Sequence, residues 1–194
     1  MNPLTQIRFL LRITHTHSLV RRYFVVNGFD GALTMLGLIM GFLISEPADL
    51  SVIISACLGA AIALGVSGVS SAYVSELAER RRALRKLEDA MVADLQQGAH
   101  GEAARWIPML VALVNGSAPL IICLIIIIPL WLAEAGMVLF IAPLYVSIIT
   151  AFILIFLLGV FLGRISEISW LRGGLQTLLV ALLTILLIFL FAGD

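Results

Sequence analysis

The chain has 194 residues and no net charge, with 61% hydrophobic and 12% charged residues. Soluble domains have about 45–50% apolar and about 25% charged residues, so this chain has too few charges for a water-facing surface. The composition therefore excludes a soluble domain and a disordered chain, and the zero net charge gives no reason to expect nucleic acid as a partner. We expect an all-α integral membrane protein.

Five apolar runs are long enough to cross a bilayer, which takes about 20 helical residues. They cover residues 24–45, 50–74, 107–133, 137–162 and 175–192. The sequence thus predicts transmembrane helices 1 and 2 within residues 24–75 and transmembrane helices 3 to 5 within residues 107–194.

The distribution of basic residues predicts the orientation of these spans. All 12 Lys and Arg residues lie before the first run, between the second and third, or between the fourth and fifth. Loops rich in Lys and Arg stay in the cytoplasm, so we expect a cytoplasmic N-terminus and an external C-terminus. The charged residues expected on the external side are all acidic, namely Glu46, Asp49, Glu134 and Asp194.

Two polar segments flank the first pair of spans. Residues 1–23 mix Leu and Ile with Arg and have no long apolar core, so we interpret them as an interfacial amphipathic segment and not a signal peptide. His15 and His17 are either metal ligands or, as the different faces of i and i+2 favour, a solvated pair. His100 stands alone.

Residues 76–106 are predicted to form a cytoplasmic amphipathic helix and linker between spans two and three. Apolar residues recur there at helical spacing, and Gly98 and Gly101 are expected to end the helix. Glu76 and Glu79 lie on one side of it at i and i+3. They are either ordinary solvated residues, with Glu76 paired to Arg80, or oxygen ligands that gather divalent cations at the cytoplasmic mouth.

Small residues recur in the spans at the spacing that allows close helix packing. Gly37 and Gly41 form such a pair in the first span, and Gly159 and Gly163 form another in the fourth. The second span has a longer series, with a small residue at every fourth position: Ser55, Gly59, Ala63, Ser67, Ser71 and Ser75.

Asp30 is the acidic residue that lies well inside a predicted span. A carboxylate at that depth costs several kcal/mol unless it faces water, a cation or a partner, so it suggests an ion site. The alternative is a protonated, hydrogen-bonded acid near the interface, bonded to Asn27 or Asn115.

The run from Asn27 to Gly41, with Asp30–Gly31 followed by Gly37 and Gly41, resembles the first-span motif of the vacuolar iron transporter family. The resemblance continues through residues 59–65, 73–76 and 128–130 and through the five predicted spans. Where the family has a carboxylate inside the second span, this chain has Ser55, Ala56 and Cys57.

This resemblance implies a homodimer in which the first spans pair across a two-fold axis and line a metal path. It implies exchange of protons for Fe²⁺ or Mn²⁺, moved out of the cytoplasm as the transported ion, with no tightly bound cofactor. The implied metal-site residues are Asp30, Glu76 and Glu79, with Met35 and Met40 as soft ligands or, alternatively, packing residues. Gly37 and Gly41 would form the dimer seam.

The implied location is the cell membrane in a prokaryote or a vacuolar-type membrane in a eukaryote, with lipids as further partners. An enzyme is not expected, because no nucleophile and base occur at suitable spacing. The alternative from another class is a membrane scaffold, sensor or lipid-handling protein that does not transport and keeps the same five-helix fold.

Overall fold

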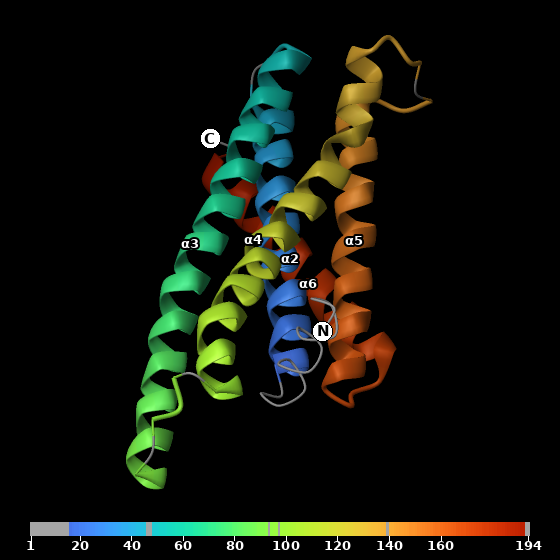
Figure 1. Cartoon of the computed structure of the whole chain (residues 1–194). Helices are drawn as coiled ribbons and strands as arrows, with labels where there is room; N and C mark the ends of the chain where they lie inside the picture. Colours follow the sequence, from blue (N-terminus) through green and yellow to red (C-terminus); the bar gives the residue numbers. More distant parts are fainter. Residues whose placement is uncertain (1–15, 46–47, 93, 97, 139, 193–194) are drawn as a thin grey trace.

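The computed structural model describes residues 16–45, 48–92, 94–96, 98–138 and 140–192, which form five α-helices. They are α2 (Thr16–Ile44), α3 (Leu50–Met91), α4 (Ala99–Glu134), α5 (Pro143–Ile165) and α6 (Trp170–Ala192). Short connections make consecutive helices antiparallel, so the chain runs up and down through one bundle (Figure 1). All five described helices are long and apolar enough to cross a membrane. The protein is therefore a multi-pass membrane protein, as its composition predicts.

The helix boundaries correct two predictions. Residues 16–23 belong to the first spanning helix, whereas residues 1–15 of the predicted interfacial segment lie outside the described residues. Gly101 does not end a helix, because α4 begins at Ala99 and passes through it, with Gly98 as the N-cap. The side chains of the three histidines also lie outside the described part of the chain.

Helix α3 joins the second span to the predicted amphipathic helix without a break. Its 42 residues extend roughly 63 Å at 1.5 Å per residue, about twice the thickness of a hydrocarbon core. The last turns of α3 consequently project past the other helices (Figure 1). The helix ends at Met91, and the following residue Val92 caps it by adopting the left-handed conformation and donating its backbone N–H to the Glu88 carbonyl.

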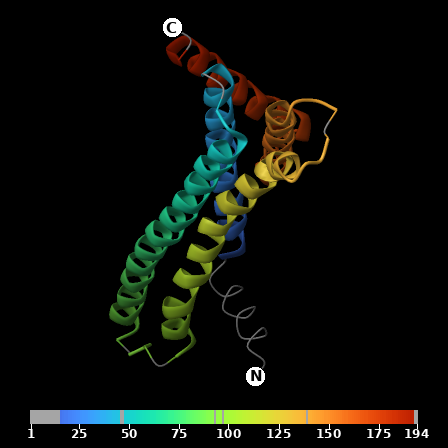
Figure 2. The ribbon, with the colours of Figure 1, turned by 90° about the horizontal axis from the view of Figure 1, so that it is seen from above.

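The helices form two pairs, α3 with α4 and α5 with α6, and α2 lies between the pairs (Figure 2). Over the described residues, α3 contacts neither α5 nor α6. Large apolar side chains of α2, α4 and α5 form the core, including Met35, Leu36, Ile126, Leu130 and Ile155. A smaller cluster joins the first turns of α4 to the start of α2, where Ile107 packs near Tyr23.

Glycines set the close contacts between helices. A β-carbon on Gly68 of α3 would lie 2.9 Å from Gly116 Cα of α4. A β-carbon on Gly159 of α5 would lie 2.7 Å from the Gly173 carbonyl oxygen of α6, so the packing predicted for this glycine is confirmed. The six small residues at every fourth position of the second span, from Ser55 to Ser75, lie outside these close contacts, because all six are exposed on α3. The tight contact of α3 uses Gly65 and Gly68 instead.

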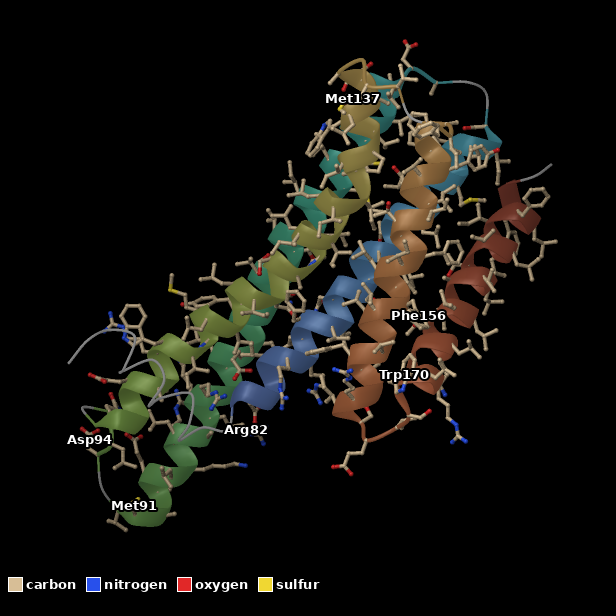
Figure 3. All side chains as sticks on the ribbon, turned by 90° about the vertical axis from the view of Figure 1, so that its right-hand side faces the viewer. Arg82, Met91, Asp94, Met137, Phe156 and Trp170 are labelled. Atoms are coloured by element: carbon tan, nitrogen blue, oxygen red, sulfur yellow. The ribbon has the colours of Figure 1, made fainter. Side chains whose placement is uncertain are left out.

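The described Lys and Arg residues all lie at one end of the bundle, which we call the basic end. It contains the start of α2, the second half of α3, the start of α4, the end of α5 and the start of α6. Figure 3 shows Arg82 and Met91 near this end and Met137 at the opposite end. The Lys and Arg residues that cluster between the predicted spans of the sequence thus lie together at one end of the folded bundle.

Candidate functional site

Asp30 lies on α2, six residues after the apolar run of that helix begins at Phe24. Six residues correspond to roughly 9 Å along the helix axis, about a third of the hydrocarbon thickness. Its side chain is exposed, and no hydrogen bond or ion pair joins its carboxylate to any other described residue. Its backbone carbonyl accepts a hydrogen bond from Thr34 Oγ1 at 2.8 Å. The Asp30 carboxylate, within the apolar part of α2, therefore points away from the bundle.

The face of α2 around Asp30 is largely uncovered by the rest of the chain. Asp30, Thr34, Gly37 and Gly41 are spaced by 4, 3 and 4 residues and so share one side of the helix. A β-carbon on Gly41 would have nothing within 4 Å, and one on Gly37 would meet only Ile188 Cδ1, at 3.7 Å. We call these four residues the open face.

The two asparagines proposed as partners of Asp30 bond to other groups. Asn27 Nδ2 donates to Asn115 Oδ1 of α4 and to the Tyr23 carbonyl. Asn115 Nδ2 donates in turn to the Gly68 carbonyl of α3 at 2.8 Å. This asparagine bridge ties α2, α3 and α4 together, and its role is structural because it satisfies polar groups inside the bundle.

The two candidate methionine ligands belong to the core. Met35 is fully buried and Met40 is 9% exposed, and both pack in the main hydrophobic cluster. Met35 follows Asp30 by five residues, about 140° around the helix, so its thioether lies on the opposite side from the open face. Both positions agree with the alternative in which Met35 and Met40 are packing residues.

The two candidate acids of α3, Glu76 and Glu79, have different environments. Glu76 is buried, 9% exposed, and its Oε1 pairs with Arg80 Nε at 2.7 Å, as the alternative to metal gathering predicts. Glu79 is exposed. The Arg80 guanidinium thus forms an ion pair with the Glu76 carboxylate, which was a candidate oxygen ligand for metal. No group of three or more His, Cys, Asp or Glu residues within the described chain is arranged to hold a metal ion.

The fold defines the class of the protein: it is a multi-pass helical membrane protein. Its distinguishing feature is an ionisable residue, Asp30, exposed on the open face of a spanning helix. Comparison with known proteins then gives the family. The chain is 31% identical over 172 residues to the uncharacterized protein MJ0645 of Methanocaldococcus jannaschii, covering 87% of this chain and 86% of that protein. The two proteins therefore belong to one family. No model of a known protein family matches the sequence, and neither does any solved structure.

Proposed function

We propose that this protein is a divalent metal transporter that works as a homodimer, with its ion path along the open faces of two α2 helices. The transported ion is Fe²⁺ or Mn²⁺, exchanged for protons. The basic end faces the cytoplasm by the positive-inside rule, which makes the second half of α3 a cytoplasmic helix. The metal leaves the cytoplasm in this proposal. The resemblance of the run from Asn27 to Gly41 to the vacuolar iron transporter motif supports the choice of substrate.

The observation that carries the proposal is the Asp30 carboxylate, exposed at membrane depth on a face that its own chain leaves open. An ionised side chain facing lipid there is costly, so a partner, water or a cation must face it instead. A second copy related by a two-fold axis through the open faces supplies a second Asp30. Two carboxylates balance the charge of one divalent ion, and carboxylate oxygens suit Mn²⁺ and Fe²⁺.

Gly37 and Gly41 support the same arrangement. Glycines on the face of a membrane helix allow a second helix backbone to approach closely, and these two share the open face with Asp30. Their spacing matches the small-xxx-small pattern of paired membrane helices. The proposal therefore joins the acid and the glycines in one interface.

Of the two candidate acids, Glu76 and Glu79, only Glu79 keeps an exposed carboxylate that can attract cations to the cytoplasmic mouth. Glu76 holds Arg80. We assign Glu79 an auxiliary role in raising the local concentration of metal, and Asp30 the essential role. Glu79→Gln should therefore weaken apparent metal affinity while leaving the maximal rate measurable.

The test is transport by the purified protein in liposomes, following Mn²⁺ and Fe²⁺ movement driven by a pH gradient. Wild-type vesicles should transport at a rate well above protein-free vesicles, and Asp30→Asn should reduce transport to that background. Glu134→Gln is the matched control, because Glu134 is an exposed acid at the end of α4 away from the basic end. Wild-type vesicles that move neither ion would contradict the proposal and favour the scaffold, sensor or lipid-handling alternative.

A further inference from the structure

Helices α3 and α4 line two open hollows that the proposed transport does not use. A pocket of about 460 Å³ lies at the basic end, where Tyr73, Arg81, Arg85 and Glu88 of α3 face Arg105 of α4. An apolar groove of about 500 Å³ lies between the same helices further into the bundle. Each hollow is formed by both helices, which lie side by side (Figure 2).

The pocket and the groove follow one continuous face of α3. The groove is lined by Val66 and Ser70, and the pocket by Tyr73, Leu77, Arg81 and Leu84. These six residues are spaced by 4, 3, 4, 4 and 3, which keeps them on one side of a helix. Ser70 and Tyr73 are one helical turn apart, roughly 4.5 Å along the axis, so the groove leads into the pocket.

Three guanidinium groups line the pocket, from Arg81, Arg85 and Arg105. None of the three forms a hydrogen bond or ion pair with the described residues, in contrast to Arg80, which binds Glu76. The acid in the lining, Glu88, accepts the backbone N–H of Leu95 through Oε1 at 3.1 Å. The lining therefore carries a net positive charge in planar donors that suit phosphate oxygens.

The depth of the pocket matches the headgroup layer of a membrane. Tyr73 and Trp106 are exposed, by 42% and 53%, where α3 leaves and α4 enters the apolar part of the bundle. Exposed Tyr and Trp side chains are typical of the membrane–water interface. The groove side of the same helix pair is apolar, with exposed Ile62 and Val66 on α3 and exposed Leu113 on α4.

We propose that this site binds one anionic phospholipid, with its phosphate on Arg81, Arg85 and Arg105 and one hydrocarbon chain in the α3–α4 groove. The charge of the pocket selects an anionic headgroup, and the adjoining groove favours a lipid over a free anion. Basic pockets between membrane helices on the cytoplasmic side bind such headgroups. The site lies outside the open face of α2, so the inference stands apart from the proposed transport.

The test is lipid binding to the full chain, delipidated in mild detergent and followed by native mass spectrometry and thermal unfolding. Phosphatidylglycerol should bind as one molecule per chain and raise the unfolding midpoint, whereas phosphatidylcholine and inorganic phosphate should bind at least about tenfold more weakly. Arg81→Gln/Arg85→Gln/Arg105→Gln should weaken phosphatidylglycerol binding by at least about tenfold. The matched control is Arg21→Gln/Arg164→Gln/Arg172→Gln, which removes three exposed charges from the same end and should change binding little.

A second pair of variants tests the groove. Val66 is exposed and lines the groove, so Val66→Phe places a phenyl ring in the groove. Ile153→Phe adds the same ring at an exposed position on α5, away from the groove. Only Val66→Phe should weaken phosphatidylglycerol binding, and should leave the unfolding midpoint of the lipid-free protein unchanged. If the triple Arg variant does not fold, Arg105→Lys replaces it, because it keeps the charge and loses the planar fork.

Three results would overturn the inference. Equal losses in the two triple variants would show that general surface charge attracts the lipid. Equal affinity for phosphatidylcholine would remove the role of the arginines. Inorganic phosphate that binds as tightly as phosphatidylglycerol, with no effect of Val66→Phe, would identify a site for a free anion. Because none of these measurements contains metal, their outcome does not depend on the proposed transport.

Discussion

Gly31 of α2 packs directly against Pro119 of α4: a β-carbon on Gly31 would lie 2.8 Å from Pro119 Cα. This contact fixes the rotation of α2 about its axis. Asp30 precedes Gly31 by one residue, about 100° around the helix, so the contact turns the Asp30 carboxylate away from α4. The direction in which the open face points thus depends on Gly31, the residue that follows Asp30.

The first prediction concerns this contact. Gly31→Ala places a methyl group against the backbone of Pro119, so the helices must move apart at a cost of about 1–3 kcal/mol. We expect a lower thermal unfolding midpoint in detergent. Gly59→Ala is the control, because a β-carbon on exposed Gly59 meets nothing within 4 Å. Equal stability of the two variants would show that the Gly31–Pro119 contact does not constrain the bundle.

The second prediction concerns the asparagine bridge. Asn115→Ala removes the acceptor of Asn27 and the donor to Gly68, so it should destabilise the fold by about 0.6 kcal/mol, and at most about 1.7 kcal/mol, for each of these two interhelical hydrogen bonds. A double-mutant cycle with Asn27→Ala should give a positive coupling energy. Ser117→Ala is a suitable control, because Ser117 Oγ bonds only within α4, to the Val114 carbonyl. Additive effects of the two Asn substitutions would exclude the bridge.

The third prediction concerns the dimer. Both native cysteines, Cys57 and Cys123, are buried, so a cysteine added at the surface reports its own contacts. Gly41→Cys should form a disulfide-linked dimer under mild oxidation in lipid, because the open faces meet at a two-fold axis. Ile153→Cys, exposed on α5, should remain monomeric on denaturing gels. A Gly41→Cys chain that stays monomeric in lipid would count against the interface.

The fourth prediction concerns orientation. Exposed Ala48 lies in the connection between α2 and α3, and exposed Ala90 lies near the end of α3 at the basic end. A membrane-impermeant thiol reagent should label Ala48→Cys from outside the cell, and Ala90→Cys only after the membrane is opened. Labelling of both positions from the same side would contradict the arrangement of the spans.

Hydropathy and charge were enough to predict the five spans and the continuation of α3 as an amphipathic helix, because both depend on local residue type and helical period. The start of α4 was predicted too late, since Gly101 was expected to break a helix that in fact tolerates it at its first turn. Spacing placed Glu76 and Glu79 on one helix side. It did not reveal that Glu76 is buried against Arg80 while Glu79 is exposed.

The other features of the candidate site depend on contacts between distant segments. Whether Asp30 faces the bundle or its surroundings is set by the rotation of α2, and that rotation depends on Pro119, 88 residues after Gly31. The pocket of arginines has the same origin. Arg81 and Arg105 lie on different helices, so no pattern along the chain indicated that they line one pocket.

The fifth prediction tests the central claim, that two Asp30 side chains form one ion site between two copies of the chain. Mn²⁺ binding to the purified dimer, followed by electron paramagnetic resonance, should give one membrane-site ion per two chains. Asp30→Asn should lose that ion and remain a dimer, because a neutral amide of the same size is cheaper to bury than a carboxylate. Glu134→Gln should bind as the parent does. One ion per chain, or a folded Asp30→Asn dimer that still binds Mn²⁺ with the parent affinity, would contradict the account.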